Sequence, residues 1–236
     1  MFIDDYFNEP GGRVCFTREQ ASGFAKHVAD DFNPIHDIDS KRFCVPGDLL
    51  FAVMLAKYGV SQHMQFVFSG MVSDGVELVL PQPGPQLSIC DAQGREYLQV
   101  QRGGGNSLDA SLVENLTRSY VAFSGHTFPH ILAPLLKEQQ VMINPQRPMV
   151  IYQSMEIDLD TLDITAPTLV SERNELQIDG KRGAVLLAFR LMEGERVVGR
   201  GCKRMLMSGL RPFDDAAFEA GVSQYLAHKD AYAAGA

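Results

Sequence analysis

The chain has 236 residues, of which 45% are hydrophobic and 21% are charged, and its formal net charge is -8. These fractions are typical of a globular protein and exclude a disordered or low-complexity chain. The negative charge argues against binding to nucleic acid or to anionic membranes. The longest nearly uninterrupted apolar run, Leu49–Ala56, is far shorter than the roughly 20 residues that span a bilayer. We therefore expect neither a nucleic-acid nor a membrane partner.

The N-terminus and the cysteines together predict a cytoplasmic protein. Asp4 and Asp5 stand where a signal peptide carries basic residues, and no long apolar stretch follows them. The four cysteines are scattered and form no C-x-x-C pair, which is typical of buried small side chains in a reducing compartment. They are Cys15, Cys44, Cys90 and Cys202.

The first element expected in chain order is an amphipathic helix over residues 17–30. Thr17 and Gln20 have the spacing of a capping box, in which the two side chains satisfy free backbone donors at the helix start. Apolar residues then follow at the spacing of one helical stripe. Pro34 disfavours helical geometry at the residue before it, so residues 31–36 are expected to form a loop that leaves the helix.

A second helix is expected over residues 48–58. It begins after a Pro-Gly pair and ends before a glycine, and Asp48 suits the positive end of the helix dipole. Its residues 49–56 are apolar on every side, so other structure has to wrap it.

Short β-prone runs separated by turn residues follow this helix and predict the sheet that wraps it. The expected strands are 65–72, 76–80, 86–91, 96–101 and 117–123. Between the last two, the polar stretch 102–106 contains Gly103-Gly104-Gly105. Without a lysine or a helix start of the P-loop type, these glycines indicate a flexible loop rather than a phosphate cradle.

The same order then recurs, with an apolar helix over 128–142, interrupted by Pro134, and a further set of strands. The expected strands are 149–159, 167–178, 184–193 and 196–208, the last two forming a hairpin, and a terminal helix covers 213–228. One central helix followed by a run of strands, twice, predicts two similar halves, residues 1–123 and 124–236.

The densest polar cluster lies in the loop that follows the first helix. Asp31 and His36 are five residues apart on a chain bent by proline, so both side chains are able to point into one cavity and hold a water molecule. One group would remove a proton and the other would supply one. Nearby, Gly47 precedes the expected buried helix. Its backbone N–H is a free donor at the positive end of the helix dipole, and such a donor suits an oxygen that becomes negative in a transition state.

These residues carry a resemblance to a known family. Asp31-Phe32-Asn33-Pro34-Ile35-His36 matches the D-x-N-P-[IL]-H signature of MaoC-like enoyl-CoA hydratases of the R-specific, hydratase 2 type, and the chain resembles that family over about residues 16–80. The resemblance implies an α+β hot-dog fold, in which an antiparallel sheet wraps a central helix. With two halves, it implies a double hot-dog of two such sheets, in which only the first half, 1–123, carries the motif.

The resemblance also implies an activity. It is that of a lyase that adds or removes water at a trans-2-enoyl thioester, with coenzyme A or acyl carrier protein as part of the substrate and no other cofactor. Asp31 and His36 would be the acid/base pair that activates water and protonates the α-carbon. Asn33 would orient the loop and its water, and the N–H of Gly47 would bind the thioester oxygen.

The chain departs from the family pattern at three positions. Asp30 stands where the family usually has glycine, and Pro46 and Asp48 flank Gly47 where histidine and a small or apolar residue are usual. A charge on Asp48 that faced the thioester oxygen would oppose enolate stabilisation, whereas an Asp48 that caps the helix would be harmless.

Other functions remain open on the sequence. The unusual residues Pro46 and Asp48 are compatible with a protein that binds acyl thioesters without catalysis. A third alternative is an acyl-CoA thioesterase, in which a carboxylate activates water. The loop residues are also typical turn formers. A metal site is disfavoured because the crowded His and Asp residues of 27–39 lack H-x-H or H-x-x-x-H spacing.

Further polar residues have simpler explanations. His63, His126 and His130 stand alone and are expected to be structural or exposed. The basic residues between 181 and 211 suit either the phosphates of coenzyme A or, more simply, a solvated sheet face. The two halves would pair within one chain, so we expect a monomeric pseudo-dimer or a homodimer.

Overall fold

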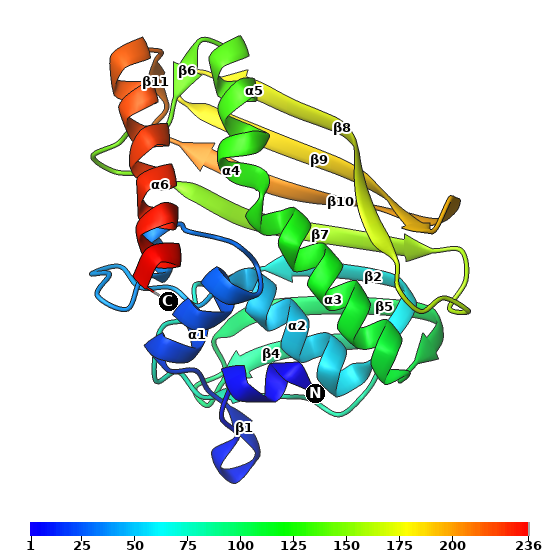
Figure 1. Ribbon diagram of the computed structural model, residues 1–236. Coiled ribbons are helices and arrows are strands. Elements are labelled where there is room, and N and C mark those ends of the chain that lie inside the picture. The colour runs from blue at the N-terminus through cyan, green and yellow to red at the C-terminus, as the bar shows by residue number, and fades with distance from the viewer. Residues whose placement is uncertain (236) are drawn as a thin grey trace.

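The computed structural model describes residues 1–235 and shows one curved sheet wrapped around two helices (Figure 1). The two helices are α2 (Gly47–Tyr58) and α3 (Ala110–Gly125), which contact each other. Within residues 1–235 the sheet has nine strands, in the order β1-β3-β4-β5-β2-β7-β10-β9-β8, and every neighbouring pair is antiparallel. This is the predicted α+β class, a double hot-dog arrangement.

The two predicted sheets are joined into one. The pairing of β2 with β7, from His63 opposite Asp158 to Val67 opposite Ser154, connects the strands before α3 to those after it. The strands before α3 are β1 (Arg13–Val14), β2 (Val60–Phe68), β3 (Leu78–Val79), β4 (Gln86–Asp91) and β5 (Glu96–Ser107). Those after it are β7 (Val150–Leu159), β8 (Thr168–Asp179), β9 (Arg182–Glu193) and β10 (Arg196–Ser208).

Shorter elements surround this framework. Two-residue strands β6 (Val141–Met142) and β11 (Arg211–Pro212) pair with each other. The remaining helices are α1 (Arg18–His27), α4 (Thr127–His130), α5 (Leu132–Glu138), α6 (Asp215–Gly235) and the 3-10 turns η1 (Phe2–Tyr6), η2 (Pro10–Gly12) and η3 (Pro34–His36).

Helix α2 is the centre of the core, as its apolar sequence predicts. Every residue from Leu49 to Leu55 is at most 3% exposed. The ring of Phe51 lies 5.1 Å from that of Phe66 on β2 and 4.7 Å from that of Tyr120 on α3, measured between centroids. Helix α2, whose first residue is Gly47, is therefore fixed by packing along its length.

The expected strand 117–123 is wrong, because this segment lies in α3. Its β-branched and aromatic residues suit a strand, but the buried positions of α3 recur at helical spacing. They are Leu112, Val113, Leu116, Thr117, Tyr120, Val121, Ser124 and Gly125. A boundary at residue 123 would fall inside α3, so a division that leaves this helix intact lies before Ala110 or after Gly125. The division itself stays a prediction.

Two other expectations are wrong. Gly103-Gly104-Gly105 is not a loop but part of β5, which pairs with β2 across an irregularity between Ser61 and His63. The expected helix 128–142 is divided into α4, α5 and β6. Its first break lies at Phe128, whose backbone is extended (φ -113°, ψ 131°), because the residue before a proline disfavours helical geometry.

The capping box predicted for α1 is present. The hydroxyl of Thr17 accepts a hydrogen bond from the N–H of Gln20 at 3.1 Å, and the Gln20 side chain accepts one from the N–H of Thr17 at 3.0 Å. We expect Thr17→Ala to lower the free energy of unfolding by about 1 kcal/mol, measured by chemical denaturation. Thr17→Ser keeps the hydroxyl and is expected to match the wild type, so equal losses in both variants would contradict the prediction.

Candidate active site

The loop between α1 and α2 is shaped by two successive side-chain turns. The carboxylate of Asp31 accepts a hydrogen bond from the N–H of Asn33 at 2.9 Å, and the Asn33 side chain accepts one from the N–H of Ile35 at 3.2 Å. The second bond caps η3, which Pro34 opens and which presents His36. Asn33 thus fixes the loop through the backbone, while its predicted contact with a water stays a prediction.

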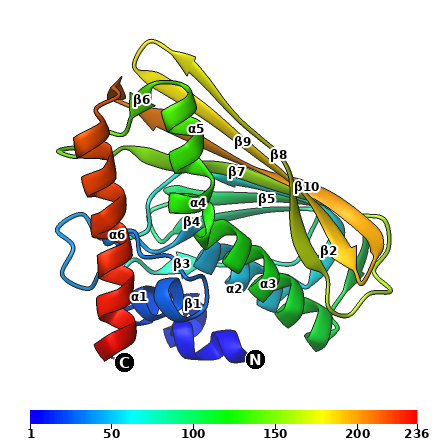
Figure 2. The same ribbon diagram turned by 45° about the horizontal axis from the view of Figure 1, so that its top comes forward.

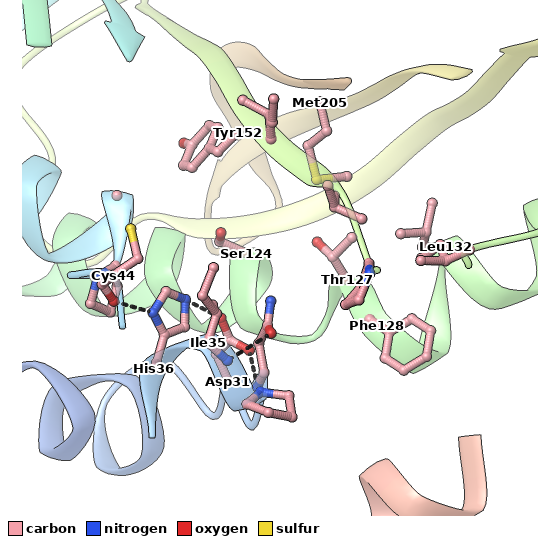
Figure 3. A pocket seen from close by; sticks show the side chains of 18 of the residues that line it. Asp31, Ile35, His36, Cys44, Ser124, Thr127, Phe128, Leu132, Tyr152 and Met205 are labelled. Carbon is pink, nitrogen blue, oxygen red and sulfur yellow. Dashed lines mark hydrogen bonds and ion pairs between the residues drawn. The ribbon is translucent and has the colours of Figure 1, made fainter. Parts of the chain in front are cut away.

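Asp31 and His36 face each other across a short gap at the cavity wall (Figure 3). His36 Nδ1 lies 2.6 Å from the carbonyl oxygen of Cys44. A carbonyl only accepts, so Nδ1 carries a proton and donates it, which leaves Nε2 of the neutral ring as an acceptor. Nε2 lies 3.6 Å from Asp31 Oδ2, too far for a direct hydrogen bond but suited to a shared water molecule.

Gly47, the first residue of α2, lines the same cavity, which has a volume of about 700 Å³. The rings of Phe68 and Tyr152 flank this glycine, with their centroids 4.3 Å apart. A Cβ atom at position 47 would lie 3.0 Å from the Tyr152 ring, so a larger residue would press into the cavity wall. The structure therefore brings the four predicted residues, Asp31, Asn33, His36 and Gly47, to one cavity.

A second polar cluster, which the sequence did not reveal, lines the cavity beside Gly47. Asp48 does not cap α2; its Oδ2 atom accepts a hydrogen bond of 2.5 Å from the hydroxyl of Ser124 at the end of α3. The same hydroxyl accepts a hydrogen bond of 2.5 Å from the ammonium group of Lys203 on β10. We call Asp48, Ser124 and Lys203 the buried polar cluster; their exposed fractions are 6%, 4% and 6%.

Aromatic groups extend this cluster. Lys203 Nζ lies 4.3 Å from the ring centroid of Tyr152, a cation–π arrangement. The hydroxyl of Tyr152 is hydrogen-bonded to that of Tyr120. Burial raises the pKa of both tyrosines well above the ordinary value. Both phenols therefore remain protonated at neutral pH.

Burial also raises the pKa of Asp48 above its ordinary value of 3.8, against the opposing effects of Lys203 and of the Ser124 hydroxyl. We expect the stability of the wild type relative to Asp48→Asn to fall as pH rises from about 4 to the raised pKa of Asp48. In this range the unfolded chain has lost the Asp48 proton while the folded protein retains it, so folding binds a proton and stability decreases with pH. The difference should level off above the raised pKa. Denaturation of both proteins across this range checks it, and a constant or rising difference would contradict it.

The alternation of β10 is the sequence signal that places Lys203 inside. The expected solvated face includes this residue, yet it shares the inward face of β10 with Met205 and Met207, two and four positions on. The solvated-face account does fit its neighbour Arg204, which lies 2.8 Å from Glu156. Ser124 carries no comparable signal, because it is a lone serine between the expected strand 117–123 and the expected helix 128–142.

The far end of the cavity is apolar, and residues of α6 line part of it. Helix α6 lies beside α5 and α1 (Figure 2). Its lining includes Phe128, Leu132, Leu136, Met142, Met205 and Phe218. Helix α6 also contacts the loop between α1 and α2. The Tyr225 hydroxyl accepts a hydrogen bond of 3.1 Å from the N–H of Phe32, and Lys229 Nζ lies 2.5 Å from Asp30 Oδ2. The last helix thus closes one side of the cavity.

Within residues 1–235, no three His, Cys, Asp or Glu side chains are grouped in a way that could hold a metal ion. In the same part of the chain, no helix is both long and apolar enough to cross a membrane. His63 and His126 are exposed side chains, each 2.8 Å from an aspartate, Asp158 and Asp30 respectively.

Residues 1–216 match a family described as proteins of unknown function, DUF3581. The chain belongs to the DUF3581 family. The match spans the whole sheet and both central helices of this DUF3581 protein, and ends at the start of α6. A comparison with curated proteins found no match.

Solved structures with a similar arrangement share little sequence with the DUF3581 protein. A MaoC-like dehydratase is 9% identical, with a TM-score of 0.42 over 89% of this chain and 98% of its own. A conserved hypothetical protein of Mycobacterium tuberculosis, described as a double hot-dog fold, is 12% identical, with a TM-score of 0.39 over 81% and 90%. An acyl-CoA thioesterase II from Mycobacterium marinum is 8% identical, with a TM-score of 0.38 over 72% and 90%.

Proposed function

We propose that this DUF3581 protein is a MaoC-like lyase that adds or removes water at a trans-2-enoyl thioester of coenzyme A or acyl carrier protein. The observation that carries the proposal is the Asp31–His36 pair. The two groups face each other over 3.6 Å at the wall of a large cavity, and the Cys44 carbonyl orients the imidazole. A water held between Asp31 Oδ2 and His36 Nε2 would have both of its protons directed at acceptors.

The reaction would proceed by addition to the β-carbon. The Asp31–His36 pair takes one proton from the water while the oxygen bonds to the β-carbon, and the pair then delivers one proton to the α-carbon. The two transfers balance, so the pair ends in its starting protonation state. Between them, negative charge develops on the thioester oxygen, and the free N–H groups at the start of α2, including that of Gly47, are the donors suited to it.

Hydration of short- and medium-chain trans-2-enoyl-CoA by the purified protein tests the proposal. The loss of the enoyl absorbance reports hydration, and thiol release, followed in parallel, reports hydrolysis. Hydration by the wild type that exceeds that of both Asp31→Asn and His36→Ala supports the lyase. Thiol release without hydration would favour a thioesterase, and binding without either reaction would favour an acyl-thioester-binding protein.

A further inference from the structure

Polar atoms of the cavity wall lack partners within the protein. Among residues 1–235, three buried side-chain atoms make no hydrogen bond, and two of them, Asp48 Oδ1 and Thr127 Oγ1, belong to residues that line the cavity. Asp48 is 6% exposed and Thr127 is 5% exposed. Buried polar atoms are nearly always hydrogen-bonded in folded proteins. Two unpaired atoms at one cavity are therefore expected to meet either water or a polar group of the molecule that fills it.

Lys203, which lines the same cavity, has a hydrogen-bond donor without a partner. Its ammonium group has three N–H donors, of which one is given to the Ser124 hydroxyl while the Tyr152 ring covers another side of the group. Ser124 is fully used, because it accepts from Lys203 and donates to Asp48. The buried polar cluster thus leaves a free donor on Lys203 and a free oxygen on Asp48, both in residues that line the cavity.

The position of these residues indicates which part of a substrate would meet them. Figure 3 shows Ser124 and Tyr152 between His36 on one side and Leu132 and Phe128 on the other. A thioester whose reacting carbons lie at the Asp31–His36 pair would extend its acyl chain past the cluster into the apolar end. An unsubstituted alkyl chain would leave the Lys203 donor and the Asp48 oxygen buried against methylene groups.

We infer that the preferred acyl group carries a hydroxyl beyond its β-carbon, which accepts a hydrogen bond from Lys203 and donates one to Asp48. This inference rests on the proposed function, because it takes the ligand to be an acyl thioester. A hydroxyl both donates and accepts, so it fits either protonation state of the Asp48 carboxyl. A keto oxygen would accept from Lys203 but would pair with Asp48 only when that carboxyl is protonated, and a carboxylate would place a second negative charge beside Asp48 whenever Asp48 is ionised.

The test compares saturated probes, which hydration does not consume. Calorimetric titration of the full-length protein would use octanoyl-CoA, a series of octanoyl-CoA derivatives with one hydroxyl at successive carbons beyond the β-carbon, and the corresponding dicarboxylic acyl-CoA. We expect a hydroxyl at one or two adjacent positions to tighten binding by about tenfold, as hydrogen bonds to charged groups do. Equal binding of all probes, or tightest binding of the dicarboxylic probe, would overturn the inference.

Variants on the two faces of β10 assign the preference to Lys203. Lys203→Met should reduce the ratio between hydroxylated and plain octanoyl-CoA towards one, while Arg204→Met, on the outer face beside Glu156, should keep the wild-type ratio. Equal ratios in the two variants would contradict the assignment. Thermal melting shows whether Lys203→Met folds, and the wild-type probe series remains decisive if it does not.

The outcomes also separate this inference from the proposed function. Hydration of enoyl-CoA by a protein that shows no preference for a hydroxylated chain would overturn the inference alone. A clear preference in a protein without hydration would overturn the lyase and leave the inferred ligand class standing. No binding of any acyl-CoA probe would overturn both.

Discussion

Asp31→Asn is expected to lower the rate of enoyl-CoA hydration by about a hundred- to ten-thousandfold. The amide is nearly the same size as the carboxylate but does not accept a proton from water. Its oxygen can still accept the hydrogen bond from the N–H of Asn33, which measures 2.9 Å, so the loop should keep its shape. The loss should therefore appear in kcat with little change in KM, measured by steady-state kinetics of enoyl absorbance.

Two further variants define what this result means. His36→Ala should produce a loss of similar size, because the imidazole shares the gap with Asp31. Asp39→Asn removes an exposed carboxylate from the same connection, outside the cavity lining, and should leave the rate unchanged. A wild-type rate in Asp31→Asn, or equal losses in Asp31→Asn and Asp39→Asn, would exclude the proposed role of the pair.

Gly125→Ala should destabilise the whole protein. Gly125 ends α3 directly against the segment that follows α1, and an added Cβ atom would lie 1.7 Å from the backbone oxygen of Ala29. Backbone cannot move aside as a flexible side chain can, so we expect a loss of about 3 kcal/mol in the free energy of unfolding. For a chain of this size, Tm should fall by about 6–12 °C, measured by calorimetry or circular dichroism.

Gly221→Ala provides the matched control. Gly221 lies within α6, and an added Cβ atom there would have no heavy atom within 4 Å apart from the nearby backbone of its own helix. Alanine is favoured over glycine inside a helix by up to about 1 kcal/mol, so this variant should melt at or slightly above the wild-type temperature. If Gly125→Ala melted at the same temperature as Gly221→Ala, the close approach of α3 to Ala29 would be wrong.

The sequence was informative where a cap, an apolar run or a turn marked an element. The capping box of α1 and the all-round apolarity of α2 predicted both helices, and the hairpin of β9 and β10 was predicted from its turn. Helix α3 was missed because Thr117, Tyr120 and Val121 have the composition of a strand, although their burial follows a helix. Propensity over seven residues could not reveal the surrounding helical period.

The residues of the candidate site were also predictable only where they lie close together in the sequence. Asp31, Asn33 and His36 lie in one short loop, so their spacing alone indicated a shared site. The buried polar cluster has no such spacing, because Asp48 and Ser124 are 76 positions apart and Ser124 and Lys203 are 79 apart. Only the packing of α2, α3 and β10 brings them together, and that packing follows from contacts across the whole sheet.

The distance in sequence between the two ends of the cavity has a consequence during synthesis. A ribosome that has just completed α2 has already made the Asp31–His36 loop, but β10, which carries Lys203, is still untranslated. A nascent chain at that stage has one wall of the cavity and lacks the opposite one. A ligand that needs both walls would bind only after β10 has been made, and its binding would stabilise chains that include β10 over translation products that end before it.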